Sequence, residues 1–170
     1  AVGPGTYAAA IQRGFDPGFT DPRGGPDGTD WPAPPDFAPL LTDADRSRRF
    51  GEFRYEPIAG VDDIRILGTW RRENIVMLGV PALAGVKGAP PSGKIAVHRL
   101  VAAQIRNLFA AWQDAALIGR ILTFDGSFAP RFIRGSRTTL SSHAWGTAFD
   151  INFPWNRLGT VPALRGEKGS

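Results

Sequence analysis

The sequence predicts an α+β domain in which a small sheet packs on a helix. Short apolar runs at residues 64–67, 74–80 and 121–128 have the length and composition of strands. Residues 94–117, in contrast, carry apolar side chains at a helical spacing. With 170 residues, of which 42% are hydrophobic, the chain is long enough to bury one core and too short for two full domains.

Residues 1–41 are interpreted as a Gly/Pro-rich linker or surface arm, and residues 42–170 as the domain. The first 40 residues contain 7 Gly and 8 Pro, a density that interrupts both helices and strand ladders. Four aromatic residues argue against pure disorder there: Phe15, Phe19, Trp31 and Phe37. Because isolated aromatic side chains in such segments often dock on a neighbouring domain, we expect an extended arm.

The domain is expected to begin with a short helix that is capped at Thr42 and ends near Phe50. Residues 53–60 have no periodic pattern and are expected to be irregular. The apolar runs at 64–67 and 74–80 predict two strands joined by a polar turn.

The main core helix is expected to begin near Lys94 and to end near Gly119. Its apolar stripe falls within an arc of roughly 80° when each residue advances by about 100°. The stripe consists of Val97, Val101, Ile105, Leu108 and Trp112. His98 lies at the edge of the stripe, so we expect it to be a half-buried structural histidine rather than a ligand. A strand at 121–128 follows, and then a loop that contains Arg131, Arg134 and Arg137.

Charge is distributed unevenly along the chain. Residues 1–60 carry 6 Lys/Arg against 9 Asp/Glu, whereas residues 61–170 carry 14 against 7, a net charge of +7. A basic surface favours an anionic partner such as a cell wall, an acidic lipid or nucleic acid. No nucleic-acid-binding motif accompanies the charge, so we expect no specific nucleic-acid partner. No run of residues approaches the roughly 18 apolar residues of a membrane span, and none is expected.

A candidate metal site lies at residues 141–152, with the sequence SSHAWGTAFDIN. The chain has no cysteine, so a metal here must be held by His and carboxylate. His143 and Asp150 can meet at one ion only if the chain reverses between them, and Gly146 can adopt the backbone conformation that such a turn needs. After the turn, residues 147–153 alternate as in a strand, with Asp150 and Asn152 on one face. The spacing alone leaves a second interpretation open, a surface histidine with a capping aspartate.

The string S-x-H-x-x-G-x-A-x-D, from Ser141 to Asp150, resembles the zinc-binding motif of the M15 peptidases. This family comprises D-alanyl-D-alanine carboxypeptidases, vancomycin-resistance dipeptidases and phage L-alanyl-D-glutamate endopeptidases. The resemblance extends to residues 125–136 and, more loosely, over residues 60–157. It implies a mainly antiparallel sheet packed on helices, as in the Hedgehog/DD-peptidase-like fold.

The resemblance implies a role for each matching residue. His143 and Asp150 become two ligands of a Zn²⁺ ion, and Ser141 and Asn152 become neighbours that orient the site through hydrogen bonds. In the family an arginine before the motif polarises the scissile carbonyl or holds a substrate carboxylate. We expect this role for Arg131, or in second place for Arg134; alternatively, both belong to a solvated basic loop.

The sequence departs from the family pattern after Asp150. The family uses a second histidine as third ligand and an acidic residue shortly before it as general base. Here no histidine follows His143, and the only acidic residue after Asp150 is Glu167. We therefore expect the third ligand and the catalytic acid beyond Ser170.

The function implied by the resemblance is zinc-dependent hydrolysis of peptidoglycan stem peptides. The enzyme would be an L-Ala-D-Glu endopeptidase or a D-Ala-D-Ala carboxypeptidase, located outside the cell or in the cell envelope, as a bacterial protein or a phage lysin. The alternative is a non-catalytic cell-wall-binding module that retains the peptidase fold. The full set of zinc ligands distinguishes the two.

Overall fold

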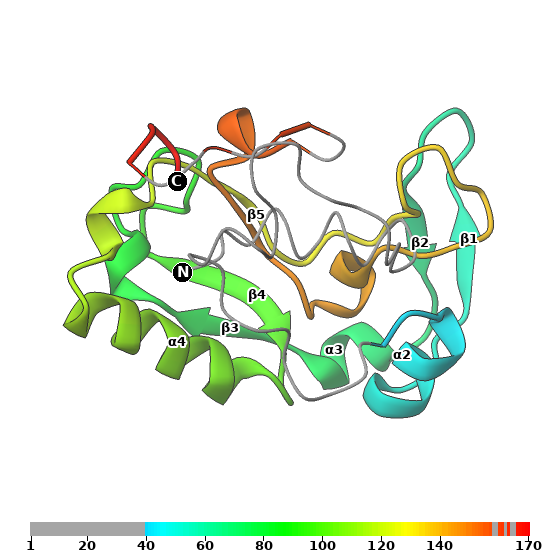
Figure 1. Ribbon diagram of the computed structural model, residues 1–170. Helices are drawn as coiled ribbons and strands as arrows, with labels where there is room; N and C mark the ends of the chain where they lie inside the picture. Colours follow the sequence, from blue (N-terminus) through cyan, green and yellow to red (C-terminus); the bar gives the residue numbers. More distant parts are fainter. Residues whose placement is uncertain (1–39, 158–159, 162, 164–165) are drawn as a thin grey trace.

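The computed structural model describes residues 40–157, 160–161, 163 and 166–170, so the predicted arm lies almost entirely outside the described residues. The described part combines helices with three two-stranded antiparallel sheets (Figure 1). The predicted α+β class is therefore confirmed at this level. Within these residues no helix is both long enough and apolar enough to cross a membrane.

Helix α2 (Asp43–Phe50) forms as predicted because its first turn is capped by side chains. The Thr42 hydroxyl accepts a hydrogen bond from the backbone N–H of Asp45 at 3.1 Å, and the Asp45 carboxylate accepts one from the Thr42 backbone N–H at 3.4 Å. This reciprocal capping box satisfies N–H groups that a helix start leaves without partners. The Thr42 hydroxyl also donates to the Asp45 carboxylate at 2.6 Å, and this hydrogen bond is the largest cause of the lowered pKa of Asp45.

The next segment differs from the prediction in two respects. Part of residues 53–60, expected to be irregular, forms strand β1 (Tyr55–Pro57), which pairs with β2 (Ile64–Ile66). The expected polar turn is the short helix α3 (Trp70–Asn74), and β2 does not pair with the strand that follows it. Trp70 is the first residue of α3, and its buried ring packs on that of Phe53, with the two ring centroids 4.6 Å apart.

The prediction that the main helix begins near Lys94 is wrong. Residues Lys94–His98 form strand β4, paired with β3 (Ile75–Gly79), and helix α4 runs over Ala102–Asp114. Ile95 and Val97 are buried and are separated by the less buried Ala96, as expected for one face of a strand. Val97 also fits a helical stripe by coincidence, since one residue cannot distinguish a period of 2 from one of 3.6.

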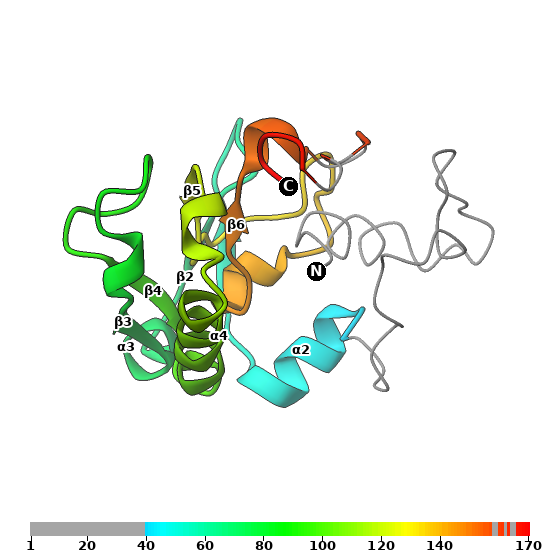
Figure 2. The ribbon, with the colours of Figure 1, turned by 60° about the vertical axis from the view of Figure 1, so that its left-hand side comes forward.

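The core consists of two groups of buried side chains. The first joins β3 and β4 to α4, which lies along this strand pair in Figures 1 and 2. Its buried members are Leu78, Val80, Leu83, Ile95, Val97, Ile105, Phe109, Ile121 and Phe124. The second group lies near β1, β2 and α3 and consists of Ile64, Trp70, Phe132, Leu140, Ala144 and Trp145. The segment with the predicted metal ligands lies between the two groups.

The strands expected around the site are shorter than predicted. The run 121–128 contributes strand β5 (Phe124–Gly126), and 147–153 contributes the two-residue strand β6 (Asp150–Ile151). These strands pair with a register shift between Phe124 and Gly126. Single 3₁₀ turns complete the described fold: η2 (Pro81–Leu83), η3 (Ile118–Arg120), η4 (Ser142–Trp145) and η5 (Phe153–Trp155).

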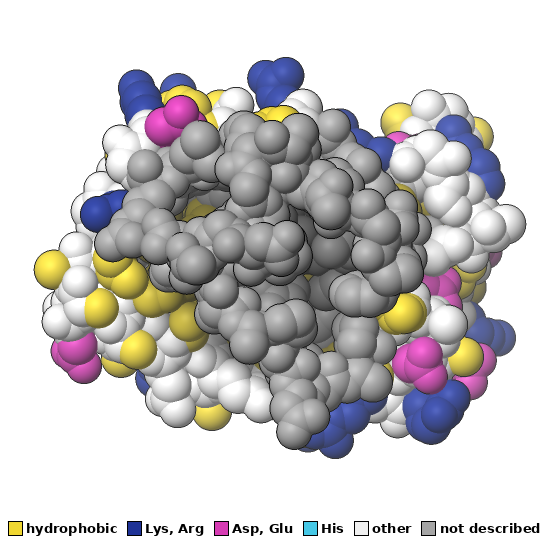
Figure 3. Space-filling model, viewed as in Figure 1, with side chains coloured by type: hydrophobic (Ala, Val, Ile, Leu, Met, Phe, Trp, Pro, Cys, Tyr) yellow, Lys and Arg dark blue, Asp and Glu magenta, His cyan; other side chains and the backbone are white. Residues whose placement is uncertain are grey.

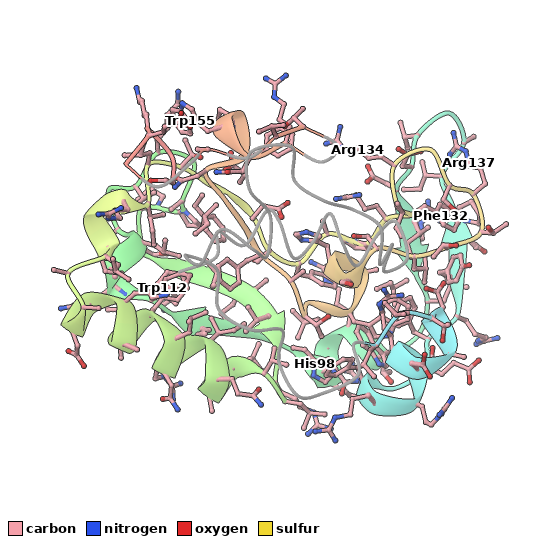
Figure 4. All side chains as sticks on the ribbon, in the orientation of Figure 1. His98, Trp112, Phe132, Arg134, Arg137 and Trp155 are labelled. Carbon is pink, nitrogen blue, oxygen red and sulfur yellow. The ribbon has the colours of Figure 1, made fainter. Side chains whose placement is uncertain are left out.

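His98 differs from the prediction in two respects, because it ends strand β4 instead of lying on the helix and is fully buried instead of half-buried. The backbone N–H of Leu100 donates to Nδ1 at 3.1 Å, so Nε2 carries the proton and donates to the Phe50 carbonyl at 3.1 Å. Figure 4 shows His98 beside α3 and α2. Complete burial lowers the pKa of this imidazole, because the charged form loses its solvation.

The lowered pKa of His98 predicts a loss of stability in mild acid. The unfolded chain takes up a proton at His98 near pH 6.5, whereas the folded protein does so only at lower pH. Unfolding therefore takes up a proton in this window, and the free energy of unfolding decreases as the pH falls below about 6.5. Urea titrations between pH 7.5 and pH 5 measure this loss. His98→Gln should reduce it, and His143→Gln, which leaves His98 in place, should retain the His98 contribution.

Candidate metal centre

His143 lies on η4, a single 3₁₀ turn that begins after Ser141. The Ser141 hydroxyl accepts from the backbone N–H of His143 at 3.3 Å and thereby caps the turn. Both residues are buried, with Ser141 at 0% and His143 at 8% exposure. The predicted orienting role of Ser141 is thus exerted on the backbone that carries His143, and not on its ring.

Gly146 reverses the chain after His143, as expected from the sequence. Its φ of 69° and ψ of 28° are left-handed, and its N–H closes the turn on the His143 carbonyl at 3.0 Å. Its carbonyl accepts from the His98 backbone N–H at 2.8 Å, which attaches the turn to β4. A Cβ at this position would lie 2.9 Å from the His98 nitrogen and 2.9 Å from the Ile75 side chain. Glycine is therefore required both for the backbone conformation and for space.

The turn brings His143 and Asp150 together. Their closest side-chain atoms, Nε2 of His143 and Oδ2 of Asp150, are 3.3 Å apart. The other ring nitrogen, Nδ1, lies 2.6 Å from the carbonyl oxygen of Ser127. A carbonyl can only accept a hydrogen bond, so Nδ1 carries the proton. In the neutral ring the lone pair of Nε2 then faces the carboxylate.

A positive charge between two electron-rich atoms that face each other stabilises their approach. A metal ion can supply this charge. Two ligands at about 2.0–2.2 Å from a tetrahedral zinc are roughly 3.3–3.6 Å apart, whereas a charge-assisted N–H···O bond measures about 2.7–2.9 Å. The 3.3 Å separation of Nε2 and Oδ2 lies within the range for two zinc ligands. A backbone carbonyl on the second ring nitrogen is also the usual arrangement for a histidine that binds a metal.

The predicted arginines lie near the motif in sequence, but the structure does not bring their side chains onto the pair. Arg131 is half-buried, and its guanidinium donates to the Phe132 carbonyl at 3.1 Å. Its backbone carbonyl accepts from Ser141 N–H at 3.0 Å, so the loop is attached to the start of the motif. Arg134 and Arg137 are both exposed and are labelled in Figure 4. Across the described residues, no hydrogen bond or ion pair joins either predicted arginine to His143 or Asp150.

Asn152 has a different role from the one predicted. It adopts a left-handed φ of 54°, which ends β6. Its amide oxygen accepts from Leu122 N–H at 2.7 Å and Thr123 N–H at 3.2 Å, and its NH₂ donates to the carbonyls of Arg120 at 2.8 Å and Gly169 at 3.2 Å. These bonds use both the NH₂ group and the oxygen of the side-chain amide, so the Asn152 side chain has no group left to orient a metal ligand. Asn152 instead joins the residues before β5 to those near position 169.

The hydrogen bond from Asn152 to the Gly169 carbonyl forms a clamp, to which Asn156 contributes. The NH₂ group of Asn156 donates to the same Gly169 carbonyl at 2.8 Å. A Cβ on Gly169 would lie 2.7 Å from the Trp155 side chain, so residue 169 is closely packed against that ring. Segments 152–156 and 166–170 therefore hold each other in place after strand β6.

Sequence reasoning missed two parts of the site. The carbonyl of Ser127 gives no sequence signal, because every residue has one; only the proximity of residues 125–136 to the motif pointed to this segment. Helix α2 contacts the motif through Asp43, which accepts from the Leu140 N–H, and through Arg46, which lies over the Trp145 ring. These contacts were missed because they span about a hundred positions along the chain.

A third metal-binding side chain does not accompany His143 and Asp150 in the described part of the chain, where no group of three or more His, Cys, Asp or Glu residues is gathered. Comparisons with models of protein families, with curated proteins and with solved structures find no match for this chain. Inferences about the chemistry of the site therefore rest on its own geometry.

Gly146→Ala tests the turn that brings the pair together. A left-handed alanine costs about 1–2 kcal/mol, and the close contacts with His98 and Ile75 add to this. We expect the free energy of unfolding to fall by more than about 2 kcal/mol. Gly135→Ala is the matched control, because Gly135 has a φ of 80° but a Cβ added there would meet nothing within 4 Å. Equal losses in the two variants, measured by urea unfolding, would contradict the close packing of the turn.

Proposed function

We propose that His143 and Asp150 bind a zinc ion and that the chain hydrolyses the stem peptides of peptidoglycan. The observation that carries the proposal is the 3.3 Å separation of Nε2 and Oδ2 in a pair whose histidine already has its other nitrogen on a carbonyl. Both atoms are then free to act as ligands. The remaining positions on the metal would be filled by water, by substrate and by a donor from outside the described residues.

The surroundings of the pair suit a metal that must remain accessible. The His143 side chain is 10% exposed, whereas the Asp150 side chain is 41% exposed, so the pair is fixed on one side and open on the other. The Ser127 carbonyl fixes the orientation of the imidazole and makes Nε2 a better donor of electrons. A bound zinc supplies Lewis-acid activation of water and of a peptide carbonyl.

The substrate class comes from the resemblance of Ser141–Asp150 to the M15 zinc motif, and with it the finer fold proposal, a Hedgehog/DD-peptidase-like domain. Arg131 remains the candidate for contact with the substrate carboxylate or the developing oxyanion, and Arg134 the second. To act so, the Arg131 guanidinium would have to leave the Phe132 carbonyl when substrate binds.

The charge of the chain supports attraction to an anionic wall. On the face in Figure 3, Lys and Arg side chains are spread around the margin with Asp and Glu between them at several points. The net charge of +7 over residues 61–170 favours long-range attraction to an anionic partner. It agrees with a protein that acts at the cell envelope or outside the cell.

The alternative is a wall-binding module that keeps the fold without catalysis. It is favoured by the absence, within the described residues, of a third metal-binding side chain beside the pair. The two proposals differ in one measurable property. The module would bind purified peptidoglycan and release nothing from it.

Zinc titration tests the metal site directly. The chelator-treated protein is titrated with Zn²⁺ against a chromophoric competitor. His143→Ala and Asp150→Asn should each weaken zinc binding more than about 100-fold, beyond the usual effect of changing a residue outside the ligand set. Asp114→Asn, which changes an exposed carboxylate at the end of α4, should bind zinc as the unaltered protein does. Equal affinity in all four proteins would refute the site.

Activity is measured on purified peptidoglycan in the presence of zinc, with released fragments identified by mass spectrometry. Free D-Ala would indicate a carboxypeptidase, and new D-Glu amino termini an endopeptidase. Cleavage that disappears in His143→Ala and Asp150→Asn supports the proposed enzyme. Sedimentation with peptidoglycan without any release would support the binding module instead.

A further inference from the structure

Helix α2 precedes the residues that resemble the peptidase family, yet it contacts the turn that carries His143. A single 3₁₀ turn such as η4 has little stability of its own. The direction of the His143 ring must therefore be fixed by what packs around the turn. Two charged residues of α2, Asp43 and Arg46, contact the chain on either side of His143.

Asp43 holds the chain just before the turn. Its Oδ2 accepts from the backbone N–H of Leu140 at 2.9 Å, one residue before Ser141. Its Oδ1 accepts from Nη1 of Arg46 at 3.2 Å. The two oxygens of one carboxylate therefore connect the start of the metal motif to the guanidinium of Arg46.

Arg46 holds the chain just after His143. Its guanidinium carbon lies 5.8 Å from the centre of the Trp145 ring, within the range of a cation–π contact. Trp145 is the last residue of η4 and is 1% exposed. Its indole N–H donates to the Gly51 carbonyl at 3.3 Å, directly beyond the end of α2. The ring is thus held on one face by a cation and at its edge by a hydrogen bond.

Burying a charged side chain costs free energy, because the charge loses its contact with water. Arg46 is only 5% exposed, and its burial lowers the pKa of the guanidinium, although an arginine remains charged. An apolar side chain of similar size often serves packing as well as a buried ion pair does. The ion pair instead restricts the orientation of the side chains, because a planar guanidinium between a carboxylate and an aromatic face can adopt few orientations.

We propose that Asp43 and Arg46 are positioning residues for His143, which hold its imidazole on the Ser127 carbonyl and direct Nε2 towards Asp150. The inference deepens the proposed function, and for its effect on zinc it rests on that function. The orientation of the ring can, however, be measured without metal. Failure of the positioning and failure of the zinc site are therefore distinguishable.

The histidine content of the chain makes the test direct. The sequence contains two histidines, and their hydrogen bonds require opposite tautomers in the metal-free protein, with the proton on Nδ1 in His143 and on Nε2 in His98. Long-range ¹⁵N–¹H correlation spectra at pH 8 distinguish these tautomers. His143→Gln assigns the two sets of signals, because it removes one of them.

The test variant is Arg46→Met, which keeps the length of the side chain and removes its charge. The control is Arg48→Met on the same helix, where the side chain is 77% exposed and pairs with Asp45 at 3.3 Å. We expect Arg46→Met to replace the single Nδ1–H pattern of His143 by an averaged one and to weaken zinc binding about tenfold. The His98 pattern should persist in this variant, and Arg48→Met should change neither pattern nor affinity.

Cooperative urea unfolding establishes that each variant is folded before the spectra are compared. If Arg46→Met does not unfold cooperatively, Asp43→Asn takes its place, since the amide oxygen can still accept from Leu140 while the charge opposite Arg46 is lost. A folded variant with an unchanged His143 tautomer and unchanged zinc affinity overturns the positioning role and leaves the metal site intact. If the unaltered protein binds no zinc and Arg46→Met still alters the His143 tautomer, the result supports the positioning role and refutes the metal site.

Discussion

The hydrogen bond between Nδ1 of His143 and the Ser127 carbonyl is the interaction on which the proposed chemistry depends. Because a carbonyl accepts only, it fixes the proton on one nitrogen and leaves the other as a lone pair directed at Asp150. With the proton on Nε2 instead, the same two side chains would form an ordinary hydrogen bond with no place for a cation. The backbone of residue 127 thus determines what the motif residues can do.

The sequence is most informative where a local rule decides the structure. The capped helix at Asp43–Phe50 follows from Thr42, and the reversal at Gly146 follows from the need for a residue that tolerates a left-handed backbone. The approach of His143 to Asp150 is predictable for the same reason. Their roles as zinc ligands remain a prediction, supported by the fit of the distance to a tetrahedral site.

The sequence is least informative where contacts between distant segments determine the local structure. Within Lys94–His98 only Val97 falls on the helical stripe, and the segment forms a strand that is paired along its whole length with β3. The role of Asn152 was also missed, since its four hydrogen bonds reach backbone groups about 17 to 32 positions away. The contacts of Asp43 and Arg46 with residues 140–145 also join segments that are far apart in the sequence.

The clamp of Asn152 and Asn156 on the Gly169 carbonyl has a consequence for how the chain matures. Synthesis proceeds from the amino terminus, so His143, its turn and helix α2 emerge before the segment that secures the residues after Asp150. The residues after Asp150 can therefore complete their contacts with the Gly169 carbonyl only once that late segment has been synthesised.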